Sequence, residues 1–151
     1  LPLIRKISFL DNVSKAVWMI QVDALTKTFD HFTAVDRITF SVGRGEVLAL
    51  LGPNGAGKTT TIRMLTAILT PTYGNATVAG FNVCEQPEKV RSQVGVLTEH
   101  HGLYVRMNAV EYLRFYGDLY ALPTDVRDRR VNELLEKFSL VDEAKKRLGE
   151  Y

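Results

Sequence analysis

Hydrophobic and polar positions along the first part of the chain indicate a series of short strands. Residues 37–42 alternate between apolar and polar side chains, as a half-exposed strand does, and residues 20–25 are also strand-like. The run at 47–51 is apolar without alternation, which is typical of a strand buried on both faces. Two further strands are predicted at 74–80 and 94–98. The short link between the first two strands favours an antiparallel piece.

Helical periodicity marks the stretches between and after these strands. Asn108 with Glu111 three positions later is a helix-start signature, and Pro123 ends that helix. The first helix is predicted to begin at Thr59 and to end at Pro71, and a helical turn is predicted at 87–93. We expect the apolar helix faces to lie in the core, with a docking face as the alternative for the aromatic one. These faces consist of Ile62, Leu65 and Leu69, of Tyr112, Phe115, Tyr116 and Leu119, and of Val131, Leu134, Leu135 and Phe138.

The strand at 47–51 leads into the pattern G-x-x-x-x-G-K-[ST], the phosphate-binding loop. Glycines let successive backbone N–H groups point at phosphate oxygens, and the start of the following helix adds about half a positive charge. We expect Lys58 to bridge the β- and γ-phosphates and the Thr59 hydroxyl to bind Mg²⁺, with Thr60 supporting the loop. The sequence therefore predicts a nucleoside triphosphate site. It consists of Gly52, Pro53, Asn54, Gly55, Ala56, Gly57, Lys58, Thr59 and Thr60.

Composition fits one globular domain or part of one. The 151 residues are 46% hydrophobic and 24% charged, and no stretch approaches the roughly 18 apolar residues that a membrane span requires. A net charge of +2 without a basic run argues against a nucleic-acid partner. The single cysteine, Cys84, is interpreted as a small buried hydrophobic residue. Residues 1–18 have no clear period and are interpreted as an appendage or upstream segment, before a domain at 19–151.

A phosphate loop preceded by two strands and an aromatic turn, and followed by a strand, a loop and helices, resembles the nucleotide-binding domain of ATP-binding cassette (ABC) transporters. The resemblance implies an α/β fold: a P-loop NTPase core with a mostly parallel sheet, an N-terminal antiparallel β piece and a C-terminal helical segment from about residue 105. Segments 102–104 and 116–120 resemble the drug and lipid exporter (ABC-2 type) branch.

The resemblance also implies partners, cofactors and a location. The cofactors are ATP and Mg²⁺. In the complete protein, the partners are a transmembrane permease subunit or domain and a second cassette. The location is peripheral, at the cytoplasmic face of the cell membrane.

The resemblance adds two candidate site residues outside the loop. Phe29 stands where the family has an aromatic residue that stacks on adenine, although from the residues alone it is a hydrophobic residue of a turn region at 26–34. Glu99 stands where the family has a glutamine that reaches Mg²⁺. A carboxylate also ligates Mg²⁺ but adds negative charge, so a solvated loop carboxylate is the alternative. The adjacent His100 and His101 do not share a face and are interpreted as exposed loop residues.

The family's hydrolytic motifs lie downstream of the position that matches Tyr151. They are the LSGGQ signature loop, a second nucleotide strand ending in Asp-Glu and a switch histidine. We therefore expect an incomplete, truncated domain that binds ATP without hydrolysing it at an enzymatic rate. The run at 138–143 imitates the Asp-Glu strand, but it leaves only about two residues for a strand. It is interpreted as a corner between helices, with Asp142 capping a helix at 143–148.

Three functions follow from these observations. The leading interpretation is an energy-coupling ATPase subunit of a membrane exporter. The alternative is a self-contained small-molecule or nucleotide kinase that uses Asp118 or Asp142 as a second metal contact. A nucleotide-binding module without catalysis is a third possibility. The two strands and Phe29 before the loop favour the transporter over the kinase.

Overall fold

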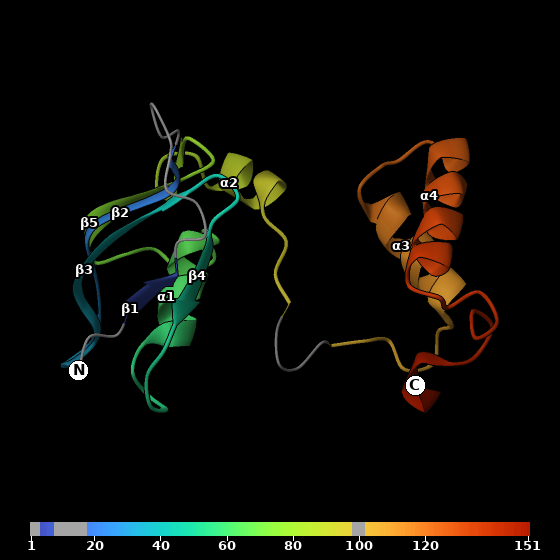
Figure 1. The fold of residues 1–151 in the computed structure, drawn as a ribbon, viewed down its shortest axis with the longest axis horizontal. Helices are drawn as coiled ribbons and strands as arrows, with labels where there is room; N and C mark the ends of the chain where they lie inside the picture. Colours follow the sequence, from blue (N-terminus) through green and yellow to red (C-terminus); the bar gives the residue numbers. More distant parts are fainter. Residues whose placement is uncertain (1–3, 8–17, 98–101) are drawn as a thin grey trace. The chain divides into compact units, whose positions relative to one another are not determined.

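The computed structural model describes residues 4–7, 18–97 and 102–151, and the chain divides into two compact units, Leu1–Val96 and Leu97–Tyr151 (Figure 1). The first unit contains β1 (Ile4–Ile7), β2 (Trp18–Phe29), β3 (Phe32–Gly43), β4 (Val47–Leu50), α1 (Lys58–Leu65), β5 (Tyr73–Val78), β6 (Phe81–Asn82) and α2 (Pro87–Gln93). The second unit contains α3 (Ala109–Leu119), α4 (Thr124–Lys137) and a 3₁₀ helix, Leu148–Glu150.

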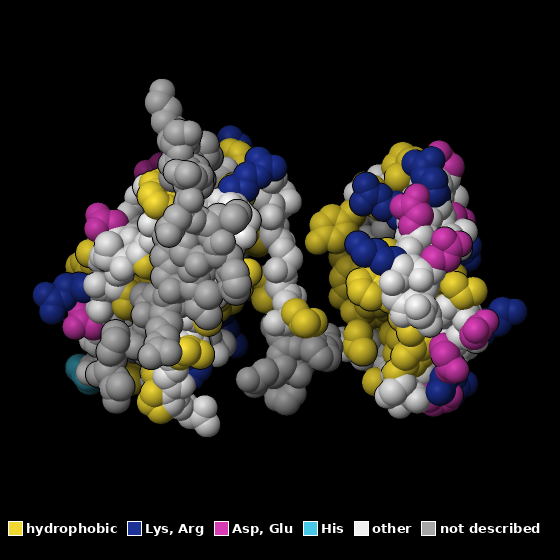
Figure 2. Space-filling model, viewed as in Figure 1, with side chains coloured by type: hydrophobic (Ala, Val, Ile, Leu, Met, Phe, Trp, Pro, Cys, Tyr) yellow, Lys and Arg dark blue, Asp and Glu magenta, His cyan; other side chains and the backbone are white. Residues whose placement is uncertain are grey.

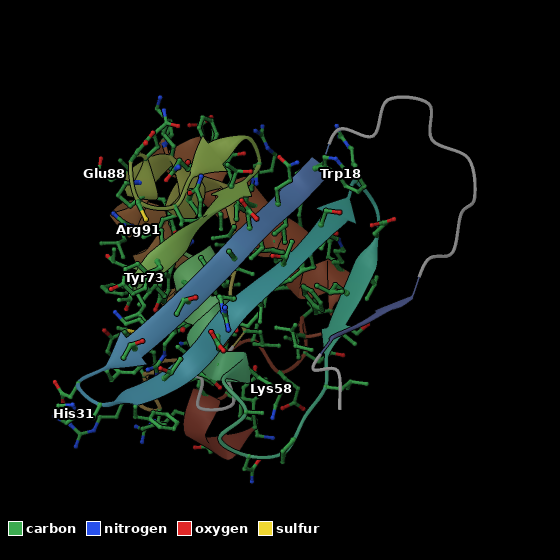
Figure 3. The ribbon with its side chains drawn as sticks, turned by 90° about the vertical axis from the view of Figure 1, so that its left-hand side faces the viewer. Trp18, His31, Lys58, Tyr73, Glu88 and Arg91 are labelled. Carbon is green, nitrogen blue, oxygen red and sulfur yellow. The ribbon has the colours of Figure 1, made fainter. Side chains whose placement is uncertain are left out.

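β2 and β3 form a hairpin that is longer than the sequence pattern predicts. The antiparallel pairing is confirmed, but the turn region expected at 26–34 is mostly strand. Phe29 pairs with Phe32 across a two-residue turn, whose tip carries His31 in Figure 3. Asp30 has a φ of 45°, which a tight hairpin turn requires. The hairpin therefore extends both strands by several residues beyond the alternating segments.

The strands form two sheets, and every strand pair in the described residues is antiparallel. The larger sheet has the order β3-β2-β5-β6, and β1 pairs with β4 in the smaller one. This differs from the mostly parallel sheet expected around β4. A parallel neighbour requires a crossover that returns a strand beside β4, but after α1 the chain enters β5, which joins β2. The strand predicted at 94–98 is also wrong for its described part, because residues 94–97 belong to no strand.

The core of the first unit lies between the larger sheet and the helices α1 and α2. Met64 on α1 is fully buried, whereas Ile62, predicted to be a core residue, is 41% exposed. The reason is that α1 packs against the core through the side that carries Thr61, Met64 and Leu65; the helix ends at Leu65, before Pro71. The buried cluster consists of Val22, Leu25, Val35, Met64, Leu65, Ala76, Val78, Val83 and Val90.

Cys84 is exposed, so its interpretation as a buried hydrophobic residue is wrong. The Asn82 side-chain oxygen accepts hydrogen bonds from the N–H groups of Cys84 at 2.8 Å and of Glu85 at 3.1 Å. This local turn buries Val83 and carries the next side chain outward.

The second unit is built on α3 and α4. The helix start predicted at Asn108 is confirmed: its side chain accepts from the Glu111 N–H at 2.9 Å, and the Glu111 carboxylate accepts from the Asn108 N–H at 3.0 Å. This reciprocal pair satisfies two backbone donors at the helix start. The buried core of the unit consists of Ala109, Val131, Leu135 and Ala144.

The aromatic face of α3 does not lie in the core, contrary to the prediction. Phe115, Tyr116 and Leu119 are 38%, 36% and 68% exposed, and Figure 2 shows hydrophobic side chains at the surface of this unit. The buried positions of α3 are Ala109 and Gly117, because small residues allow a close approach. A Cβ atom at Gly117 would lie 2.5 Å from Cγ of Arg127 on α4. On α4, Val131 and Leu135 are buried as predicted, whereas Leu134 and the C-cap residue Phe138 are exposed.

The segment after α4 is a corner, as predicted, and residues 141–145 are turns rather than a strand. The helix predicted at 143–148 is wrong. Instead, the N–H groups of Leu148 and Gly149 donate to the carbonyls of Met107 at 2.8 Å and Val105 at 3.1 Å. This pairing directs the segment into the 3₁₀ helix, whose N-cap is Arg147 and not Asp142.

Burial predicts how two substitutions on α1 affect stability. Met64→Ala removes a fully buried side chain and should lower the free energy of unfolding by about 2–5 kcal/mol. Ile62→Ala, on the exposed side of the same helix, should cost less than about 1 kcal/mol. Urea unfolding followed by fluorescence of Trp18, the chain's one tryptophan, reports on the first unit. Equal losses for the two variants would contradict the packing described here.

Candidate nucleotide-binding loop

The glycine-rich segment joins β4 to α1 in the arrangement that the sequence predicts. β4 ends at Leu50 and α1 begins at Lys58, one residue before the predicted start. The Ala56 N–H donates to the Pro53 carbonyl at 3.2 Å, which closes a turn within the loop. The last loop residue, Gly57, is the N-cap of α1 with φ 84° and ψ 4°. The segment thus curls and enters the helix through a left-handed residue, which favours glycine.

Gly57 also fixes the loop against the start of β3. It is buried, and a Cβ atom there would lie 2.3 Å from the Ala34 carbonyl oxygen and 2.9 Å from Cγ2 of Val35. The Gly57 carbonyl accepts two hydrogen bonds from Thr61, from its N–H at 2.8 Å and its hydroxyl at 2.9 Å. The position therefore requires glycine both for its backbone conformation and for the space around it.

The start of α1 and the Lys58 side chain concentrate positive charge at the loop. No side chain caps the helix start, and its first turn holds no acidic residue. Lys58 Nζ donates to the carbonyls of Gly52 and Pro53, each at 2.7 Å, which holds the ammonium group over the loop (Figure 3). In the part of the chain that the structure describes, Lys58 forms no ion pair with a carboxylate. The arrangement suits a polyanion such as a triphosphate.

A magnesium ion at this loop would have few protein ligands. Thr59, in the first turn of α1, is exposed and offers its hydroxyl oxygen. Among the described residues, no group of three or more His, Cys, Asp or Glu side chains could hold a metal ion. In phosphate-binding sites Mg²⁺ usually keeps several waters and binds through substrate phosphates with one or two protein oxygens. Glu99, and with it His100 and His101, lies outside the described residues.

The hairpin tip that carries Phe29 lies at the same end of the first unit as the loop (Figures 1 and 3). Phe29 pairs with Phe32, and the β3 residues just beyond it, Ala34 and Val35, are those that approach Gly57. Phe29 remains 44% exposed. The structure therefore places an accessible aromatic ring on the strand pair that supports the phosphate loop.

Lys27 is a further residue of this region that the sequence analysis missed. Its Nζ atom lies 5.1 Å from the centre of the Phe29 ring and donates to the Thr70 carbonyl at 2.8 Å. Spacing by two along a strand puts Lys27 and Phe29 on one face. That signal was hidden because residues 26–34 were predicted to be a turn region.

The two carboxylates considered as metal contacts for a kinase, Asp118 and Asp142, both belong to the second unit. Asp118 accepts from Arg127 Nη1 at 2.5 Å, and Asp142 lies in the turn after α4. Arg127 also donates to Asp128 at 2.9 Å, and this hydrogen bond, with the charge of Arg114, lowers the pKa of Asp128 below its usual range. Asp118 thus has a structural partner on α4, and neither residue supports the kinase alternative.

A strand, a glycine loop with a left-handed last residue and an uncapped helix start define a phosphate-loop nucleotide-binding domain. The family model described as "ABC transporter" matches residues 35–151. The chain belongs to the ABC transporter family.

The chain is similar to several ATP-binding proteins of this family. It is 38% identical over 122 residues to the probable multidrug ABC transporter ATP-binding protein YbhF of Escherichia coli, covering 81% of this chain and 21% of that protein. It is 37% identical over 134 residues to the doxorubicin resistance ATP-binding protein DrrA of Mycobacterium tuberculosis, covering 87% and 40%. The chain thus spans less than half the length of these two relatives.

A solved structure confirms the α/β fold class. The structure of an ATP-binding subunit of an ABC transporter matches with a TM-score of 0.73 and 30% identity, over 88% of this chain and 55% of that one. The resemblance to the ABC nucleotide-binding domain is therefore confirmed. The helices of the described residues are all too short or too polar to span a membrane.

The close packing of Gly57 against β3 predicts that two glycine substitutions in the loop lower the free energy of unfolding by different amounts. Gly55→Ala introduces a left-handed alanine at φ 82° with open space around it, and should cost about 1–2 kcal/mol of unfolding free energy. Gly57→Ala carries the same strain and also collides with the Ala34 carbonyl, so its cost should be larger, about 2–5 kcal/mol. Trp18 fluorescence in urea measures both losses, and a Gly57→Ala variant as stable as Gly55→Ala would overturn the proposed contact.

Proposed function

We propose that this chain binds ATP with Mg²⁺ through the loop 52–60 and that, in the complete protein, this site energises a membrane exporter. The observation that carries the proposal is the Lys58 ammonium group held over a loop that ends in an uncapped helix start. In this proposal the first-turn N–H groups and Lys58 bind the phosphates, Thr59 binds Mg²⁺, and Phe29 stacks on adenine. Glu99 remains a proposed Mg²⁺ contact.

The exporter part of the proposal rests on the family and on the printed names of relatives. The family consists of transport-coupled ATPases, and two similar proteins are named for multidrug transport and for doxorubicin resistance. ATP-binding subunits of such transporters work at the cytoplasmic face of the membrane with permease components. We infer the same place for this chain, with a permease subunit or domain and a second cassette as partners.

The role of Lys58 can be tested by binding measurements on the purified chain. Lys58→Ala removes a charge-assisted donor from the phosphate loop and should weaken binding by about 1.5–3 kcal/mol, or roughly 10- to 150-fold in Kd. Calorimetric titration with ATP and with inorganic tripolyphosphate, both with Mg²⁺, should show similar losses because both ligands present phosphates. Lys89→Met, a change on α2, is the control and should leave both affinities unchanged. Equal ATP affinity for native and Lys58→Ala chains would refute the proposed site.

We also propose that these 151 residues alone do not hydrolyse ATP at an enzymatic rate. Transfer to water requires a group that positions the nucleophile as well as charges that stabilise the phosphates. Glu143 is the last residue of the Asp-Glu-like run at 138–143, but it lies in a turn and forms an ion pair with Lys146 at 3.1 Å. Phosphate release should therefore stay far below about 1 s⁻¹ and should be unchanged by Glu143→Gln. Turnover near that rate that disappears with Glu143→Gln would sink this proposal.

A further inference from the structure

We propose that Lys27 is a positioning residue for the adenine-stacking ring, holding Phe29 by a cation–π contact while a neighbouring backbone carbonyl holds Lys27. This inference rests on the proposed function, since it assigns a role within the proposed ATP site. It adds a residue that does not touch the phosphates and acts through Phe29.

The first support is that the Lys27 ammonium group has two fixed contacts. It lies 5.1 Å from the Phe29 ring centre and donates to the Thr70 carbonyl at 2.8 Å. A cation within about 6 Å of a ring centroid is attracted to the ring face. Because the carbonyl limits where the ammonium group can lie, the ammonium group in turn limits where the ring can lie.

The second support is that Thr70 belongs to a segment bonded to the end of β2. The Thr72 N–H donates to the Thr26 carbonyl at 2.8 Å, and the Thr28 N–H donates to the Thr72 hydroxyl at 3.0 Å. The same hydroxyl donates to the Thr28 carbonyl at 3.3 Å. Three hydrogen bonds thus fix the segment that holds Lys27 to the strand that carries Phe29.

The third support is that Phe29 stays partly accessible beside Lys27. Lys27 approaches one ring face, yet Phe29 keeps 44% of its surface exposed. An aromatic side chain at a hairpin tip otherwise samples several rotamers, and ordering it costs free energy when a base stacks on it. A ring already held from one side avoids part of that cost, so base binding is favoured without a direct contact from Lys27.

The test compares ligands with and without a base on neutral variants of Lys27. Lys27→Met should weaken ATP binding about two- to fivefold in calorimetry and leave Mg²⁺–tripolyphosphate binding unchanged. Lys27→Arg keeps the cation and should restore ATP affinity. Lys27→Gln is a second neutral variant if Lys27→Met does not fold, and tripolyphosphate binding reports whether each variant is folded. In a Phe29→Ala background, Lys27→Met should have no further effect on ATP.

Lys89→Met is a matched control, because Lys89 Nζ lies 5.5 Å from the Phe81 ring, a similar pair away from the loop. It should change neither affinity. Equal losses of ATP and tripolyphosphate would show that Lys27 acts as a general charge, and would overturn the inference. So would unchanged ATP affinity in both neutral variants, or an undiminished loss in the Phe29→Ala background. If Phe29→Ala alone spares ATP binding, the adenine contact fails with this inference, whereas a loss with Lys58→Ala still supports the loop.

Discussion

The close approach of Gly57 to the backbone of β3 is the contact on which the candidate site depends. The Ala34 carbonyl oxygen lies only 2.3 Å from where a Cβ atom of Gly57 would be, so the end of the loop packs directly against the backbone of β3. On the loop side, the contact positions Gly57, the N-cap of α1. On the hairpin side, it involves the part of β3 next to Phe32, which pairs with Phe29. The Phe29 ring and the start of α1 are therefore both supported by the β2–β3 hairpin, and a shift of either strand would move both.

Local signals in the sequence predicted the parts of the site that depend on local backbone chemistry. The loop pattern fixed the position of the helix start to within one residue, and the Asn108–Glu111 spacing predicted a capping box that the structure contains. Both motifs satisfy or expose backbone N–H groups within a few residues, so the local sequence is enough to predict them. The turn at Asp30 and His31 lacks the usual hairpin glycine, which is why the strands were predicted too short.

The features that sequence could not give depend on contacts between distant segments. The aromatic face of α3 has helical spacing, but α4 packs where Gly117 leaves room, so bulk does not decide which side is buried. Ile62 is exposed although it matches the apolar period, because α1 packs against the core through the side that carries Thr61, Met64 and Leu65. The contact between Lys27 and Thr70 joins residues 43 positions apart, and no spacing rule within one strand or helix anticipates it.

The two hydrogen bonds that Lys58 makes to its own loop determine how many more it can offer. An ammonium group has three N–H donors, and the carbonyls of Gly52 and Pro53 take two of them. One N–H donor remains, and the two existing hydrogen bonds fix its direction because the ammonium group is tetrahedral. A lysine side chain loses up to about 2 kcal/mol of rotamer entropy when it is ordered. Here the carbonyls of Gly52 and Pro53 order the Lys58 side chain before a ligand binds. Lys58 therefore offers one further N–H donor to a phosphate, beside the backbone N–H groups of the loop.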